Sequence, residues 1–98
     1  MRNVTNEVVR AFLNGQTKRV SNSETNGTSL YLWGNEIARK ENGQIKINLC
    51  GYNTVTTRER LNGVLEYCIG KRALSTKQGT VLLNDKAIPS DEWVTIGE

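Results

Sequence analysis

The chain has 98 residues, of which 13 are Lys or Arg and 10 are Asp or Glu, and it contains no His, two Cys and one Pro. This length predicts one domain, residues 1–98, with a single modest hydrophobic core. Without His the sequence lacks the usual general base and the commonest metal ligand, which excludes the ordinary Ser-His-Asp and Cys-His catalytic sites. We therefore expect a protein that is not an enzyme and has neither a cofactor nor a metal site.

The cysteines and the distribution of apolar residues indicate the cellular compartment of the protein. Cys50 and Cys68 are too far apart in the sequence for a CxxC redox motif or a zinc cluster, so we expect free, partly buried thiols. No run approaches the roughly 20 apolar residues that span a bilayer, and residues 1–7 lack the apolar stretch of a signal peptide. These features predict a soluble cytoplasmic protein without membrane association.

Apolar residues recur at helical spacing near the start of the chain. Val4, Val8, Val9, Phe12 and Leu13 share one side of a helix over residues 3–14, with Asn3 as its cap and Asn14-Gly15 as its end. Residues 16–29 contain almost no apolar residues. They predict a surface loop with a short edge strand around residues 18–21.

Alternating apolar residues then indicate strands at residues 29–33, 36–40 and 44–50. The sequence Glu41-Asn42-Gly43 predicts a tight turn between the last two, because Asn and Gly accept positive φ readily. In the third strand Ile45, Ile47 and Leu49 share one face. This pattern is typical of a half-buried antiparallel meander.

A second helix is expected after residue 55. Thr56 and Glu59 have the spacing of a capping box, and Leu61, Val64, Leu65 and Cys68 recur at helical spacing before Gly70. Residues 80–83 and 92–96 predict a second hairpin, with Pro89 at an edge or in a connection. The fold class is therefore α+β: an antiparallel sheet, formed by a three-stranded meander plus a C-terminal hairpin, with two helices packed on one face.

Two blocks of the sequence resemble a known group of proteins. Residues 27–38, GTSLYLWGNEIA, and residues 51–62, GYNTVTTRERLN, are similar to the central block of a family of small uncharacterised bacteriophage proteins. The similarity covers about residues 15–65. It implies a phage gene product made inside a bacterium, and it assigns no activity and no functional residue.

The most distinctive polar cluster precedes and opens the second helix. Thr54, Thr56, Thr57, Arg58 and Arg60 place hydroxyl and guanidinium groups at a helix N-terminus, where free N–H groups attract phosphate. The alternative is a structural cap followed by two solvated arginines.

Aromatic residues in the meander form the other candidate site. Tyr31 and Trp33 are expected on the sheet face of Lys46 and Asn48, opposite Leu30 and Leu32, as in a stacking platform for single-stranded nucleic acid. The alternative is that the C-terminal hairpin or a second copy covers them.

Charge is uneven along the chain. Through Lys77 there are 12 basic and 6 acidic residues, whereas the remainder has one basic residue and four acidic ones. A basic body suggests attraction to phosphate backbones or to an acidic protein surface. The paired carboxylates, Glu59 with Glu66 and Asp91 with Glu92, have the spacing of solvated charges rather than of a hydrolase site.

Two functions remain open on this basis. The first is a non-enzymatic bacteriophage accessory protein that binds a host bacterial protein or complex in the cytoplasm of the infected cell, as an inhibitor or as a counter-defence or host-takeover factor. The alternative is a protein that binds DNA or RNA. An exposed strand edge would also allow two copies to pair. The candidate contacts with a protein partner are Tyr31, Trp33, Tyr52, Arg58 and Arg60, and those with nucleic acid are Arg39, Lys40, Lys46, Thr56, Thr57, Arg58 and Arg60.

Overall fold

The computed structural model describes the backbone of residues 3–96 and the side chains of residues 6–96. Over this range the chain forms, in order, α1 (Asn3–Leu13), β1 (Lys18–Val20), β2 (Ser23–Thr25), β3 (Ser29–Leu32), β4 (Asn35–Glu41), β5 (Gln44–Ile47), α2 (Val55–Ile69), β6 (Leu74–Lys77), β7 (Thr80–Leu83), β8 (Lys86–Ile88) and β9 (Val94–Ile96).

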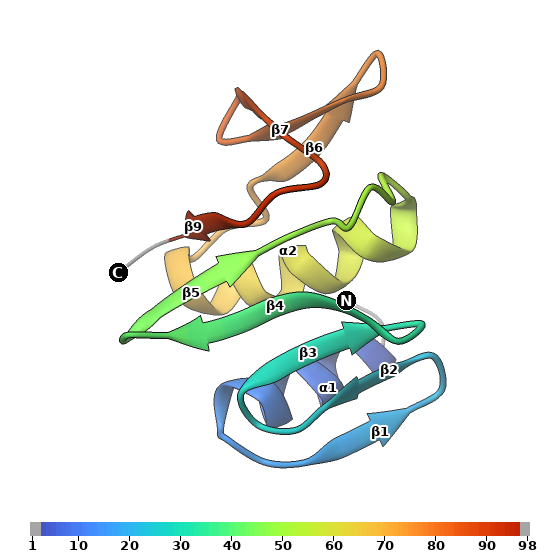
Figure 1. Ribbon diagram of the computed structural model, residues 1–98, viewed down its shortest axis with the longest axis vertical. Helices are drawn as coiled ribbons and strands as arrows, with labels where there is room; N and C mark the ends of the chain where they lie inside the picture. The colour runs from blue at the N-terminus through green and yellow to red at the C-terminus, as the bar shows by residue number, and fades with distance from the viewer. Residues whose placement is uncertain (1–2, 97–98) are drawn as a thin grey trace.

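The strands form two antiparallel sheets. The larger has the order β1-β2-β3-β4-β5-β9, and β6, β7 and β8 form the smaller one. Helix α1 contacts β1, β2 and β3, while α2 contacts α1, β4 and β6. In Figure 1 the smaller sheet lies at the top of the molecule, beyond α2. Helix α2 therefore joins the two sheets.

The prediction of an α+β protein is confirmed, but the predicted arrangement is wrong. A three-stranded meander plus a C-terminal hairpin with both helices on one face was expected, whereas the strands divide into sheets of six and three. The difference arises at both ends of the meander.

At the N-terminal end, the predicted edge strand around residues 18–21 is confirmed as β1, whereas β2 lies where a surface loop was predicted. Strand β2 pairs with β1 and β3, and its buried side chains are the hydroxyls of Ser23 and Thr25. Thr25 Oγ1 donates to the carbonyl oxygen of Ser29 at 2.6 Å and accepts from the Gly27 N–H at 3.0 Å. Hydrogen-bonded hydroxyls thus replace the apolar alternation by which a strand is usually predicted.

At the C-terminal end, the predicted hairpin of residues 80–83 and 92–96 is wrong. Strand β7 pairs with β6 and β8 across the turns Gln78-Gly79 and Asn84-Asp85, while β9 pairs with β5. Pro89 lies in the connection between β8 and β9, where its missing N–H costs no ladder hydrogen bond. The last strand therefore completes the larger sheet.

One hydrophobic core extends from the larger sheet through both helices to the smaller sheet. Val8, Val9 and Phe12 of the predicted α1 stripe are buried, as predicted, whereas the predicted cap Asn3 and the packing of Val4 lie outside the described side chains. The cluster contains Val8, Val9, Phe12, Leu30, Leu32, Ile37, Ala38, Ile47, Leu49, Leu61, Val64, Leu65, Leu74, Val81 and Ile96.

A close backbone approach fixes the turn between β2 and β3 against the end of α1. Gly27 has φ +92°, and a Cβ atom at this position would lie 2.6 Å from the Gly15 carbonyl oxygen. Because both groups are backbone, neither can rotate away. Only glycine fits here without moving the turn.

We predict that Gly27→Ala lowers the free energy of unfolding by about 2–4 kcal/mol, because left-handed strain adds to a backbone clash. Gly43→Ala is the matched control, since Gly43 has φ +78° with nothing within 4 Å of the added Cβ. That variant should lose only about 1–2 kcal/mol. Urea unfolding measures both losses, and equal losses would contradict the close approach.

Candidate functional site

Three loops gather at one end of the larger sheet. Neighbouring strands are antiparallel, so β1, β3 and β5 run in the same direction and their C-terminal ends lie at the same end of the sheet. The turns at residues 21–22 and 33–34 and the segment after β5 therefore lie together, on the right in Figure 1, where α2 begins. We call residues 21–22, 33–34 and 48–55 the turn end.

The turn end exposes apolar side chains and has no charged ones. Trp33 is 54% exposed, Tyr52 51% and Val55 64%, and the other residues are Ser, Asn, Gly, Thr, Leu and Cys. Cores of protein interfaces are depleted in charge and enriched in aromatic residues, with small polar residues supplying adaptable hydrogen bonds. This composition is typical of a surface that binds another protein.

Trp33 lies in a turn, not in a strand as predicted. It and Gly34 form the two-residue connection between β3 and β4, with φ values of 51° and 79°. Positive φ is disfavoured for a bulky residue, and such turns prefer Asn-Gly. Asn42-Gly43 occupies the next turn with φ values of 54° and 78°. The tryptophan therefore occupies a position where the backbone favours asparagine.

The N-terminus of α2 is already capped by the chain itself. The cap is Thr54 rather than the predicted Thr56, and its hydroxyl accepts from the Thr57 N–H at 3.2 Å. Thr57 is buried, and its hydroxyl lies 2.9 Å from that of Thr54. Arg58 Nη1 donates to the carbonyl oxygen of Asn53 at 3.1 Å and to its side-chain oxygen. These contacts favour the structural interpretation of the cluster over phosphate binding.

Arg60 and Asn62 face inward and join α2 to other segments. Arg60, expected among the solvated arginines, is 3% exposed, and its Nε donates to Ser23 Oγ at 2.9 Å. Asn62 donates to the Leu74 carbonyl and accepts from the Leu74 N–H, both at 2.9 Å. The side chain of Asn62 thus pairs with β6 as a neighbouring strand would. Neither role was predicted from the sequence.

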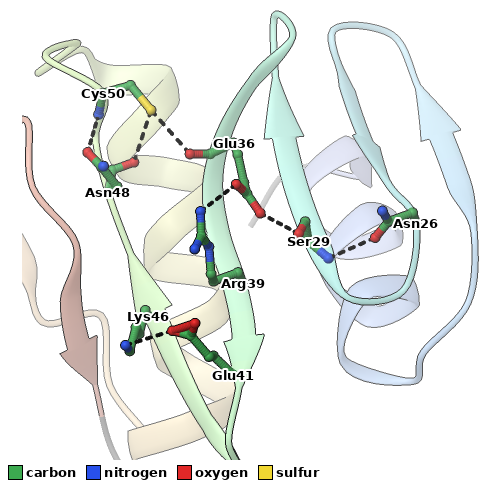
Figure 2. Close-up of polar contacts among 8 residues, drawn as sticks. All are labelled: Asn26, Ser29, Glu36, Arg39, Glu41, Lys46, Asn48 and Cys50. Carbon is green, nitrogen blue, oxygen red and sulfur yellow. Dashed lines mark hydrogen bonds and ion pairs between the residues drawn. The ribbon is translucent and has the colours of Figure 1, made fainter.

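Ion pairs occupy the face of the larger sheet shown in Figure 2. Arg39 Nη2 lies 2.8 Å from Glu36 Oε1, and its guanidinium stacks 3.9 Å from the ring centre of Trp93. Lys46 Nζ lies 2.7 Å from Glu41 Oε1, and the hydrogen bond from Lys46, and secondly its charge, hold the pKa of Glu41 below its usual value.

Tyr31, expected on this face, is half-buried and opposite Glu36 in the pairing register, while Asn48 lies beyond the end of β5, where its side chain accepts from the Cys50 N–H at 2.7 Å. On this face a cation, Arg39, stacks on Trp93, which was predicted only as part of a strand.

Lys40 has a structural position rather than an exposed one. Its Nζ donates to the carbonyl oxygens of Leu13 and Gly27, each at 3.2 Å. Each of the five basic residues proposed to contact nucleic acid therefore has a partner within the chain: Arg39, Lys40, Lys46, Arg58 and Arg60.

Both cysteines are free and half-buried, as predicted. The Cys50 thiol donates to the Glu36 carbonyl oxygen at 3.1 Å. Burial, and secondly the charge of Glu36, raise its pKa, while burial raises the pKa of Cys68 against a smaller opposing effect of Lys40. Over residues 3–96 no three His, Cys, Asp or Glu side chains are placed to hold a metal ion, and no helix is long and apolar enough to cross a membrane.

Two helices and nine strands over residues 3–96 define a small α+β protein whose exposed apolar residues gather mainly at one end. The chain matches the family model described as Kyanoviridae Gp96 protein over residues 1–97, and it belongs to this bacteriophage protein family. The family match extends well beyond the block at residues 15–65. No curated protein and no solved structure matches the chain.

We predict that Asn62→Ala lowers the free energy of unfolding by about 2–4 kcal/mol, because two buried backbone groups of Leu74 lose their partners. Asn53→Ala is the control, since the Asn53 amide donates to Thr76 Oγ1 and Gly79 O in exposed hydrogen bonds that water can replace, and Arg58 keeps the Asn53 carbonyl oxygen as an acceptor. Thermal unfolding compares the two. A loss of less than 1 kcal/mol in Asn62→Ala would contradict the pairing with β6.

The raised thiol pKa values predict slow alkylation of the folded protein. The thiolate is the reactive form, so the iodoacetamide rate at pH 8 should be several-fold below that of the urea-unfolded chain and should still rise above pH 9. Mass spectrometry of quenched samples measures both sites. Equal rates in the folded and unfolded chains would show that burial does not protect these thiols.

Proposed function

We propose that this bacteriophage protein acts without catalysis, by binding a protein of the infected bacterium in its cytoplasm through the turn end. Trp33, Tyr52 and Val55 are the apolar contacts, and the surrounding Asn, Ser, Gly and Thr residues supply hydrogen bonds. Such binding would serve as inhibition of the host protein, as counter-defence or as host takeover.

The backbone of Trp33 is the observation that supports this proposal most. A half-exposed indole at φ 51° costs on the order of 1–2 kcal/mol relative to an unstrained residue. The hairpin itself does not require a tryptophan there, because Asn42-Gly43 forms the next turn, between β4 and β5, with similar φ values. Strained residues cluster at binding sites, where the side chain is needed despite the strain.

The contacts of the residues predicted to bind nucleic acid favour a protein partner over DNA or RNA. Nucleic-acid binding depends on cations that are free to contact phosphates. The five predicted basic contacts are engaged with carboxylates, carbonyl groups or hydroxyl groups of the chain. The residues of the turn end themselves carry no charge and include two exposed aromatic rings, which suits the apolar centre of a protein interface with the Arg58 guanidinium at its side.

We predict that Trp33→Asn removes partner binding while changing the free energy of unfolding by less than about 1 kcal/mol, since relief of strain offsets lost indole contacts. The immobilised protein would be exposed to host lysate and washed in 0.5 M NaCl, and retained proteins would be compared with those held by Trp33→Asn. Tyr67→Asn is the control, because Tyr67 is an aromatic residue of similar exposure, 52%, that lies near the last turn of α2 and outside the turn end.

A host protein retained by the wild type and by Tyr67→Asn, but lost from Trp33→Asn, supports the proposal. The same retained set on all three proteins contradicts it. Fluorescence anisotropy with labelled DNA and RNA is run in parallel. Binding that weakens steeply with salt and is unaffected by Trp33→Asn would favour nucleic acid instead.

A further inference from the structure

The guanidinium of Arg60 is buried between α2 and the turn that joins β1 to β2. Its Nε donates to Ser23 Oγ at 2.9 Å, its Nη2 to Asn22 Oδ1 at 3.4 Å and its Nη1 to Glu59 Oε1 at 3.0 Å. A buried cation is tolerated when its charge is paired and its donors are satisfied. The planar fork of arginine suits this site because its nitrogens reach separate acceptors at fixed angles.

These contacts close a triangle that fixes the side chain of Asn22. Ser23 Oγ donates to Asn22 Oδ1 at 2.9 Å, so two of the residues that accept from Arg60 also contact each other. On its backbone side, the Asn22 carbonyl oxygen accepts from the Trp33 N–H at 2.9 Å. A continuous hydrogen-bonded path therefore leads from Arg60 on α2 to the backbone of Trp33.

We infer that Arg60 is a positioning residue that holds Trp33 in its exposed conformation at the turn end, an inference that rests on the proposed function. A strained residue at a hairpin tip relaxes unless its surroundings fix it. The amide of Trp33 is fixed by Asn22, and Asn22 is fixed by Arg60. Holding the indole before the partner arrives reduces the ordering cost of binding.

Amide hydrogen exchange followed by NMR tests the path without any partner. Arg60→Lys keeps the charge but loses the fork, and Asn22→Ala removes the side-chain acceptor while leaving its carbonyl in place. Both should speed exchange of the Trp33 amide about tenfold or more. Exchange of the Asn48 amide, which donates to the Ile37 carbonyl oxygen at 2.8 Å, should change much less.

Arg58→Lys is the matched control, because the Arg58 side chain donates to Asn53 and not to residues 22 or 23. It should leave the Trp33 amide unchanged. Unchanged Trp33 exchange in both test variants would overturn the inference. So would equal acceleration at Trp33 and Asn48, which would show a general loss of stability.

The capture experiment gives the functional readout. Arg60→Lys should reduce retention of the host protein several-fold, although Trp33, Tyr52 and Val55 are all present. Full retention despite faster Trp33 exchange would overturn the positioning role. If Trp33→Asn itself leaves capture unchanged, the proposed function fails. The exchange data still decide whether Arg60 holds the turn.

Discussion

The ammonium group of Lys40 joins the N-terminal helix to the middle of the larger sheet. From β4 it donates to the carbonyl oxygen of Leu13, at the end of α1, and to that of Gly27, and it lies 5.2 Å from the centre of the Phe12 ring. The last carbonyl groups of a helix lack partners and bear partial negative charge, so a cation is favoured there. The turn between β2 and β3, packed on Gly15, is fixed by the same contact.

Other inward-facing polar groups extend this principle through the molecule. Thr25 closes the turn beside Lys40, Arg60 ties α2 to the β1–β2 turn, and Asn62 ties α2 to β6. With only 37% apolar residues, a chain of this length has a small hydrophobic core. Hydrogen bonds from inward-facing polar side chains at the margin of that core therefore decide which segments pack together. Each hydrogen bond adds modest stability when it forms, but a buried donor or acceptor that loses its partner lowers the stability by more. This difference favours the one arrangement in which all of them are paired.

The same contacts explain which parts of the fold were predictable. The two helices and strands β3, β4 and β5 have apolar periodicity, and the Asn42-Gly43 turn is recognisable on its own. Strands β1, β2 and β6 consist largely of polar residues, and what orders them comes from distant positions such as Arg60 and Asn62. A local pattern does not contain that information. The partner of β9 depends likewise on where α2 places the smaller sheet.

The candidate site was only partly predictable for a related reason. Trp33 and Tyr52 are recognisable as candidate contacts, because an exposed aromatic residue on a small domain indicates a binding surface, whether the partner is a protein or a nucleic acid. The contacts of the basic residues are not recognisable in this way, because the sequence does not distinguish a lysine that faces solvent from a lysine that is paired with a backbone carbonyl group. Val55 was not predicted, because the second helix was expected to begin after it and nothing in the local pattern marks Val55 as exposed.

A comparison of turns within the chain bears most directly on function. The connections Asn42-Gly43, Gln78-Gly79 and Trp33-Gly34 all place a non-glycine residue at φ between 51° and 54° before a glycine. In the first two that residue is small or flexible and polar, as the conformation favours. In the third it is the bulkiest side chain, at the end of the sheet where residues 48–57 contain no charge. Because folding alone favours asparagine at all three positions, Trp33 is the exception that the proposed binding role would explain.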